Sequence, residues 1–510
     1  MKLPLIDLLV FLGYMAGIVL YGCSFYFRNK SADAFTVGSG NLPAWVVGLS
    51  IFATYVSSIS FLALPGKAYQ TNWNGFVFSL SIPLASYVAV RFFVPLYRSI
   101  NSVSAYYYLE TRFGAWARIY ASACYLLTQL ARMGSIMFLL ALPMNALFGW
   151  DVPLIIIGTG IGVLLYSLMG GIQAVIWTDA IQAIILIAGA LACALVLLFS
   201  LPAGPGQLFS LAAEQNKFSF GSLSTSLSDS TFWVILIYGL FINLQNFGID
   251  QSYVQRYLTT KSEKEAKFST WLGSLLYVPV SALFFFIGTA LYAYYQAQPN
   301  LLPVALQDPA LSDRVFPYFI AHGLPTGLTG LLIASIFAAG MSTISTSLNS
   351  SATIILTDYY QRYFQKNASE KSSMWVLYLA SLLMGILGVL AALAMLQVKS
   401  ALDAWWALSS IFSGGMLGLF LLGYFSRQAL KRDALIGVIA GVLVICWISL
   451  SPAYFEKTAS PLKSALHPNL AIVFGTTAIF VMGFCTAQLF NRTGKTNSKS
   501  REAASLNRKV

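Results

Sequence analysis

The sequence predicts an all-α integral membrane protein, and two observations lead to this prediction: the composition and the length of the apolar segments. Hydrophobic residues make up 57% of the 510 residues and charged residues only 9%, whereas a soluble domain carries about 25% charged residues. So few polar residues cannot cover a soluble core of this size, and the bilayer must contact most of the surface.

Apolar segments recur along the whole chain. Roughly thirteen of them reach the length of about 20 residues that a transmembrane helix needs. The first is longer than a signal-peptide core of roughly 7–15 residues, so we expect it to remain as a span. The predicted spans cover residues 3–27, 43–69, 75–97, 119–148, 152–170, 179–201, 231–250, 270–296, 326–358, 375–398, 402–425, 433–451 and 470–491.

Basic residues are distributed unevenly between the two sides of the predicted bundle. Most Lys and Arg residues fall in the loops after the odd-numbered spans and in the C-terminal tail. Because cytoplasmic loops carry the excess of Lys and Arg, we expect the N-terminus outside and the C-terminus in the cytoplasm. This explains the net charge of +12 without nucleic acid. We expect residues 1–490 to form one transmembrane domain and residues 491–510 a basic, disordered tail.

The second predicted span contains a polar interruption. Its centre reads ATYVSSIS at residues 53–60, and Pro65 and Gly66 follow. Proline removes an amide donor and clashes with the preceding turn. We therefore expect a discontinuous helix whose bare carbonyls bind ions or substrate near the midplane. The alternative is a kinked but closed helix, in which the hydroxyls bond to carbonyls one turn earlier.

A second polar segment ends the span at residues 231–250. It contains Gly239, Asn243, Gln245 and Asp250, and it lies five spans after the first interruption. Paired broken segments at corresponding positions indicate a binding site between inverted repeats. Asn243 and Gln245 are therefore candidate substrate contacts.

The span at 326–358 is rich in small and hydroxyl residues. Ala339, Ser342, Ser345 and Thr346 share one helical face, with Thr343 beside it. Such residues are common where membrane helices contact each other, which is one explanation. The other is a hard cation held by oxygen ligands; since the sequence lacks a carboxylate cluster of the kind that binds calcium, a monovalent cation is the candidate.

Two charged residues lie in or beside apolar spans. Arg132 is deep in the fourth span, where an arginine costs about 2.5–3.5 kcal/mol on insertion scales and therefore faces a cavity or a partner. Its planar fork suits the carboxylate of a substrate, and the alternative is a structural ion pair with Asp179. Asp179 itself is either a helix N-cap at the cytoplasmic edge or a carboxylate ligand facing the hydroxyls of the span at 326–358.

Three motifs carry a family resemblance: GGIQAVIWTDAIQ (170–182), QRYLTTKSEKEAK (255–267) and GMSTISTSLNSSATIILTDYY (340–360). Together they resemble the sodium:solute symporter family over nearly the whole chain. The resemblance implies a LeuT-like core of two inverted five-helix repeats, here near 43–201 and 231–425. It also implies sodium-driven import across the bacterial cytoplasmic membrane, where the charge distribution above makes the N-terminus periplasmic.

Within the family, FATYVSSISFLALPGKAY (52–69) together with Arg132 is similar to the bacterial sialic acid transporters. This resemblance implies that Arg132 binds the substrate carboxylate and that Ser57 and Ser60 contact the sugar acid. Tyr55 and Ser79 depart from the branch pattern, so the pocket is expected to differ in shape. Further implied residues are the sodium ligands Ala53, Val56, Ala339, Ser342 and Thr343, and a possible second sodium site at Asp179, Ser345 and Thr346.

The expected function is sodium-coupled symport of a small anionic solute. Sialic acid (N-acetylneuraminate) or a related sugar acid is the first candidate, and another small carboxylate or a neutral sugar is the alternative. A channel or a non-transporting membrane sensor is the alternative from another class. We expect no enzyme, because the sequence contains no HExxH motif and no nucleophile–base pair. Membrane lipid is the other expected partner, with no obligatory protein partner.

Overall fold

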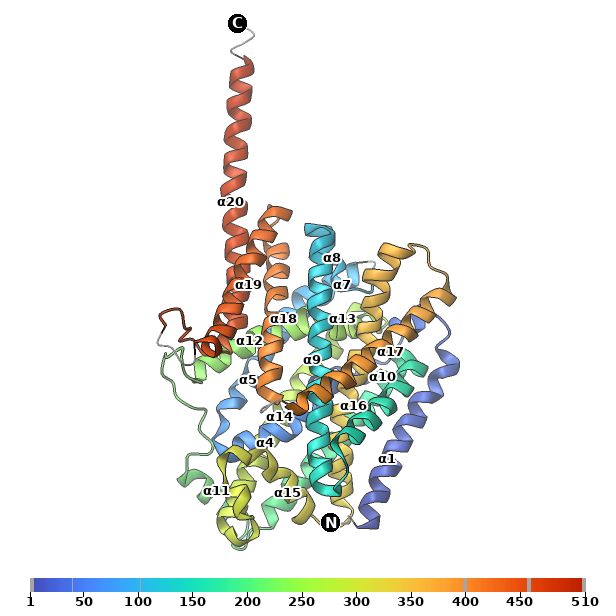
Figure 1. Cartoon of the computed structure of the whole chain (residues 1–510), viewed down its shortest axis with the longest axis vertical. Helices are drawn as coiled ribbons and strands as arrows, with labels where there is room; N and C mark the ends of the chain where they lie inside the picture. The colour runs from blue at the N-terminus through green and yellow to red at the C-terminus, as the bar shows by residue number, and fades with distance from the viewer. Residues whose placement is uncertain (1–3, 39, 101, 398–400, 456–459, 507–510) are drawn as a thin grey trace. The chain divides into compact units, whose positions relative to one another are not determined.

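The computed structural model describes residues 4–38, 40–100, 102–397, 401–455 and 460–506, and in these residues it is helical throughout with no strand (Figure 1). The α-helices are α1 (Leu5–Cys23), α2 (Ala32–Thr36), α3 (Ala44–Tyr55), α4 (Ser58–Gln70), α5 (Val77–Leu80), α6 (Ile82–Val88), α7 (Val94–Ser99), α8 (Tyr107–Phe113), α9 (Ala115–Phe148), α10 (Val152–Phe199), α11 (Pro205–Glu214), α12 (Phe232–Ile249), α13 (Gln251–Leu258), α14 (Glu263–Ala297), α15 (Val315–His322), α16 (Leu328–Ile354), α17 (Glu370–Ala394), α18 (Ala401–Phe425), α19 (Lys431–Tyr454) and α20 (Leu470–Leu506). Short 3₁₀ helices cover Ser24–Arg28, Trp73–Phe76, Pro299–Leu301, Val304–Gln307, Pro309–Arg314 and Met395–Gln397, and π-helical turns cover Ala89–Phe93 and Ile355–Phe364.

Among the described residues, ten helices are long and apolar enough to cross a membrane, and the bent pair α3–α4 forms an eleventh span. The multi-pass all-α prediction is therefore confirmed, while the count of roughly thirteen spans stays a prediction. The chain divides into two compact units. The first comprises Met1–Ala105 and Leu126–Trp406, and the second comprises Tyr106–Tyr125 and Ala407–Val510.

Helix α10 explains part of the difference in the number of spans. The structure joins the predicted spans 152–170 and 179–201 into one long helix that is interrupted at Gly171 (φ 56°, ψ −156°). A Cβ at this position would lie 2.9 Å from the Cα of Phe35, and the positive φ disfavours any other residue. Gly171 thus lets the chain change direction between two halves that each approach the length of a span.

In the first unit, α1, α10, α16 and α17 run side by side (Figure 1). Asp7 of α1 is buried, and its Oδ1 accepts hydrogen bonds from the amides of Gly327 (2.8 Å) and Gly330 (2.7 Å). Free amides at a helix N-terminus need such an acceptor. The carboxylate therefore fixes the start of α16, the helix that carries the predicted hydroxyl face.

The second predicted span is discontinuous, as expected. Helices α3 and α4 form an angle of 57°, and between them Val56 and Ser57 have extended backbone (ψ 123° and 172°). The closed-helix alternative is therefore wrong. The expected role of Pro65 is also wrong, because Pro65 lies inside α4, more than one turn beyond the break. The break coincides with the polar residues rather than with the proline.

A second break separates α12 from α13 at Asp250 (φ −74°, ψ 126°). The Asp250 carboxylate accepts a hydrogen bond from the amide of Ser252 at 2.8 Å and so caps α13. The sequence pattern predicted the polar end of α12 but treated residues 251–258 as a loop, which is wrong. These residues form a half-helix that is buried almost throughout.

The second unit contains α8, the first turns of α9, and α18 to α20. Arg112 of α8 donates from Nε to the carbonyl of Gly423 (2.9 Å) and from Nη2 to that of Ser426 (2.8 Å), which satisfies carbonyls at the end of α18. Helix α20 continues to Leu506. The disordered tail expected for residues 491–510 stays a prediction.

Candidate ion and substrate site

The two helix breaks and the hydroxyl face of α16 lie in the same region of the first unit. Helix α3 contacts α10, α13, α14 and α16, and α13 contacts α16. The backbone at Val56 and Ser57 is non-helical. Carbonyls at the end of α3 therefore lack the intrahelical hydrogen bonds that a continuous helix would give them. The sequence-based pairing of the two broken segments thus corresponds to a real spatial arrangement.

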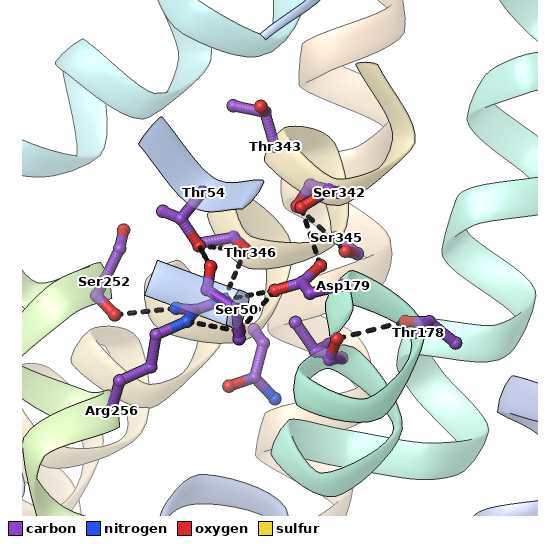
Figure 2. A network of polar contacts seen from close by, with 12 residues as sticks. Ser50, Thr54, Thr178, Asp179, Ser252, Arg256, Ser342, Thr343, Ser345 and Thr346 are labelled. Atoms are coloured by element: carbon purple, nitrogen blue, oxygen red, sulfur yellow. Dashed lines mark hydrogen bonds and ion pairs between the residues drawn. The ribbon is translucent and has the colours of Figure 1, made fainter. Parts of the chain in front are cut away.

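Asp179 is at the centre of a buried polar network (Figure 2). Its Oδ2 accepts hydrogen bonds from Ser50 Oγ at 2.6 Å and from Arg256 Nη2 at 2.7 Å. Its Oδ1 accepts from Ser342 Oγ at 2.7 Å. Asp179 lies inside α10 rather than at its start, so the N-cap alternative is wrong.

Arg256 is the positive partner of Asp179, and its side chain is only 1% exposed. Besides the carboxylate, its guanidinium contacts the Ser50 hydroxyl (Nε, 2.7 Å), the Thr346 hydroxyl (Nη2, 2.7 Å) and the Ser252 carbonyl (Nη1, 2.7 Å) (Figure 2). A buried carboxylate without such compensation would be strongly unfavourable.

Arg256 is also the functional residue that sequence reasoning missed. It follows the predicted span at 231–250, so the sequence pattern places it among the basic residues of a cytoplasmic loop. The alternative pairing of Arg132 with Asp179 is wrong, since Asp179 pairs with Arg256. A usable signal was present: Arg256 belongs to the motif QRYLTTKSEKEAK, and Asp179 is a membrane-embedded acid that needs a partner.

The hydroxyl face of α16 points toward the first helix break. Thr343 Oγ1 lies 3.4 Å from the Val56 carbonyl oxygen and 3.1 Å from that of Ala339. Ser345 Oγ donates to the Ser342 carbonyl at 3.0 Å. Of the residues implied for the shared sodium site, the structure therefore connects Thr343 directly with Val56 and Ala339.

The other implied ion ligands are also buried in this region. Ala53 of α3 and Ala339 of α16 are each 2% exposed. Thr346 Oγ1 lies 3.4 Å from Thr54 Oγ1 and accepts from Arg256. Carbonyl and hydroxyl oxygens at a half-helix end are the ligands that transporters use for Na⁺. The residue types present therefore fit a sodium ion.

Arg132 of α9 lies at the same break. Its Nη2 donates to the Thr54 carbonyl, in the last turn of α3, at 2.8 Å. Asp250 and Tyr253, at the second break, also interact with it electrostatically. The single guanidinium thus contacts the first broken helix and is close to the second.

Tyr55 connects the same two segments through its ring and hydroxyl. Its hydroxyl donates to Asn243 Oδ1 of α12, and its ring stacks on Phe247 with centroids 5.3 Å apart. The ring of Tyr277 meets it edge-on at 4.4 Å. Asn243 Nδ2 in turn donates to Ser81 Oγ at 2.9 Å. A large aromatic side chain therefore forms one wall of this region.

The remaining predicted substrate residues have different environments. Ser57 is the residue before α4, its side chain makes no capping hydrogen bond, and Ser60 lies in the first turn of α4. Ser79 is 1% exposed, and its hydroxyl donates to Ser281 of α14 at 2.8 Å. The Oε1 of Gln245 is buried without a hydrogen-bond partner among the described residues. Gln245 thus has an acceptor without a partner among the described residues, whereas Ser79 is engaged by α14.

Comparison with known proteins places this architecture in a family. The profile of the sodium:solute symporter family matches residues 35–441. The chain belongs to this family. It is therefore a sodium-coupled symporter, and the predicted sodium coupling is confirmed.

Two bacterial relatives match almost the entire chain. The sodium/sialic acid symporter SiaT of Proteus mirabilis is 35% identical over 95% of this chain and 95% of its own length. The sodium/sialic acid symporter NanT of Aliivibrio fischeri is 33% identical over 94% of this chain and 92% of its own length.

Solved structures agree with these matches. The substrate-bound, outward-open structure of a Na⁺-coupled sialic acid symporter is similar with a TM-score of 0.87 and 34% identity, covering 95% of this chain and 98% of that chain. The nucleobase-cation symporter Mhp1 is similar with a TM-score of 0.54 and 16% identity, over 91% and 96% of the two chains, which supports the fold alone. The predicted LeuT-like fold is confirmed.

Proposed function

We propose that this symporter imports sialic acid (N-acetylneuraminate) or a closely related sugar acid together with sodium by alternating access across the bacterial cytoplasmic membrane. The observation that carries the proposal is Arg132, a membrane-embedded cation that contacts the broken helix at the Thr54 carbonyl. The relatives that match over almost the full length are sodium/sialic acid symporters.

Arg132 is proposed to bind the substrate carboxylate. Its contact with the Thr54 carbonyl leaves other guanidinium donors for a bidentate pair with a carboxylate, which is the strong geometry for such pairs. Ser57 and Ser60 on the neighbouring half-helix would then contact the hydroxyls of the sugar. Asn243 and Gln245 would contact the substrate from the second broken segment.

Ala53, Val56, Ala339, Ser342 and Thr343 are proposed to hold the shared sodium ion, the first three through backbone carbonyls. Sodium at this position would join α3 to α16 and so favour the conformation that accepts substrate. The contacts from Thr343 to Val56 and Ala339 support this assignment. A ligand that binds one conformation better than another shifts the equilibrium by that difference in affinity.

A second sodium ion is proposed to bind at Asp179, where it would compete with Arg256 for the carboxylate. In the structure, Arg256 neutralises Asp179 and uses the Thr346 hydroxyl. A sodium ion on Asp179, Ser345 and Thr346 would have to displace one of these contacts. With one sodium ion and one monoanion the cycle is electroneutral; with two ions it moves one net charge, which is about 2.3 kcal/mol per 100 mV.

Closure toward the cytoplasm is proposed to depend on α13. Gln255 Nε2 donates to Asn349 Oδ1 at 2.8 Å and to Thr353 Oγ1 at 3.1 Å, both on α16. Gln251 accepts from the amide of Ala105 at 2.8 Å. These bonds join the half-helix to its neighbours at the end where basic residues indicate the cytoplasm. Release of substrate and sodium inward would require them to open.

A smaller carboxylate is the second candidate substrate, and Tyr55 favours it. The Tyr55 ring occupies space between the two broken segments, and its hydroxyl is bonded to Asn243. Both features reduce the volume and the polar groups that a large sugar acid could use. A neutral sugar would leave Arg132 unpaired.

Substitution of Arg132 tests the proposal directly. We expect Arg132→Ala to lower the apparent affinity for N-acetylneuraminate by 100-fold or so, since a charge-assisted bidentate pair contributes about 1.5–3 kcal/mol. Arg132→Lys keeps the charge but loses the fork, and we expect a smaller loss. The measurement is binding to purified protein in sodium, by calorimetry or thermal shift. Wild-type affinity in Arg132→Ala would contradict the carboxylate role.

A further inference from the structure

A cavity in the second unit lies outside every residue proposed for ions and substrate. Its volume is about 390 Å³, and it is an open pocket lined by the end of α18 with the residues that follow it and by α20. Phe425, Ser426 and Arg427 line one side, and Phe484 and Gln488 line the other. We refer to it as the α18–α20 pocket.

The charge at this pocket is positive. No hydrogen bond or ion pair engages the exposed Arg427 guanidinium among the described residues. Lys431 and Arg432 follow at the start of α19, both exposed. Asp433, which follows them, is 1% exposed, accepts a hydrogen bond from the Leu430 amide at 3.0 Å and lies 3.6 Å from Arg432 Nε. Asp433 therefore offers little repulsion to an anion.

Contacts beside the pocket fix the end of α18 and the start of α19. Arg112 donates to the carbonyls of Gly423 and Ser426, which fixes the chain where α18 ends. The Arg432 guanidinium lies over the ring of Phe490 at 3.5 Å from its centroid. These contacts hold the basic segment against the end of α20.

The rim of the pocket is apolar and exposed. Of the residues that line it, Phe425 is 61% exposed and Phe484 37%. The span in α20 runs from Leu470 to Phe490. The pocket thus lies at the end of a span, where an apolar lipid-facing surface meets basic residues.

We propose that the α18–α20 pocket binds the headgroup of an anionic phospholipid. The phosphate would pair with Arg427 inside the pocket, and the acyl chains would lie along Phe425 and Phe484. Basic pockets between transmembrane helices at the cytoplasmic side bind acidic headgroups by this combination of charge and apolar contact. A free phosphate would use the charge but not the exposed aromatic rim, so the lipid is the occupant that explains both.

The proposal is independent of the transported substrate. It involves α18, α19 and α20, and not the ion or sugar-acid residues. Loss of the lipid site is therefore expected to leave sodium and substrate affinity of the purified protein unchanged, so the two proposals fail separately.

Lipid-resolved mass spectrometry of the intact, purified protein tests the site. We expect phosphatidylglycerol to remain bound at least fivefold more than phosphatidylcholine at equal concentration. The double variant Arg427→Gln/Lys431→Gln should lose this preference while keeping Arg432, which contacts Phe490 and Asp433. Lys366→Gln/Lys371→Gln removes two exposed cations elsewhere in the described chain and should keep it. Arg427→Lys should retain most of it, which separates loss of charge from a folding defect.

Three outcomes would overturn the proposal. Equal retention of the two lipids would remove the headgroup selectivity. If the Lys366→Gln/Lys371→Gln control lost the preference for phosphatidylglycerol to the same extent, general surface charge would explain that preference. A thermal shift from inorganic phosphate as large as that from phosphatidylglycerol would make the pocket a site for small free anions.

Discussion

At the residue scale, the Asp179–Arg256 pair dominates the electrostatics of the candidate ion site. Both side chains are almost fully buried, so each protects the other from an uncompensated charge. Removing one partner of such a pair typically destabilises a protein by about 3–5 kcal/mol, whereas removing both costs less. The pair is thus a structural element as well as a possible competitor for a cation.

We therefore predict that Arg256→Gln and Asp179→Asn each lower the melting temperature of the purified protein, and that the double variant is more stable than the less stable single variant. Arg256→Gln leaves a carboxylate for sodium, so added NaCl should raise its melting temperature more than that of the wild type. Choline chloride is the control for ionic strength. If NaCl raised the melting temperatures of Arg256→Gln and Asp179→Asn by the same amount, Asp179 would be excluded as a sodium ligand.

The shared sodium site gives a second prediction at this scale. Ser342→Ala and Thr343→Ala each remove one hydroxyl oxygen that faces Asp179 or the Val56 carbonyl. We expect the sodium concentration for half-maximal uptake to rise about tenfold, which corresponds to the loss of one contact of about 1.4 kcal/mol. Ser335→Ala is the control, since its hydroxyl bonds to Leu331 and Ile185 on other turns. An unchanged sodium dependence in both variants would remove the assignment.

Single residues were predictable to different degrees. The depth of Arg132 in an apolar span indicated a functional cation, and the spacing on α16 indicated a shared face. The partner of Asp179 was not predictable, because the pair joins α10 to α13 across 77 positions in the chain. Periodicity gives no information about which of many distant cations will approach a buried acid.

At the element scale, the close approach of α14 to α4 positions the second half of the broken helix. A Cβ on Gly288 would lie 2.2 Å from the Pro65 carbonyl oxygen and 2.7 Å from the Cβ of Ala68. Both contacts are with α4, whose backbone would have to move. The position of α4 therefore depends on the absence of a side chain at residue 288.

We predict that Gly288→Ala destabilises the protein by about 1–3 kcal/mol, as expected for overpacking, and that it slows uptake. Gly162→Ala in α10 is the matched control, because a Cβ there meets nothing within 4 Å and alanine favours the helix. The measurement is the melting temperature and the initial uptake rate of both variants. A Gly288→Ala variant as stable and active as Gly162→Ala would show that α4 adjusts freely.

Composition and polar interruptions predicted most elements, including both helix breaks. Pro65 was an unreliable guide to the position of the first break, because a helix can continue through a proline when its neighbours compensate. The half-helix α13 was missed because it is polar by sequence, with Gln251, Gln255 and Arg256. The Arg256 guanidinium bonds to Ser50 of α3, Asp179 of α10 and Thr346 of α16, and only the tertiary structure shows these contacts.

At the scale of the whole molecule, a member of the sodium:solute symporter family brings the candidate ion ligands and the arginines Arg132 and Arg256 together at a pair of helix breaks. The family and the LeuT-like fold were predictable from three different motifs spread along the chain. The substrate was less predictable, since Tyr55 and Ser79 depart from the branch pattern. Their contacts with Asn243 and Ser281 now show how each is engaged.

Uptake into proteoliposomes tests the central claim most directly. Purified protein would be reconstituted, and radiolabelled N-acetylneuraminate would be supplied with an inward sodium gradient or with an equal potassium gradient. We predict saturable accumulation with sodium only, and its loss in Arg132→Ala. Equal uptake with potassium, or sodium flux that does not depend on or saturate with N-acetylneuraminate, would contradict sodium-coupled import of a sugar acid.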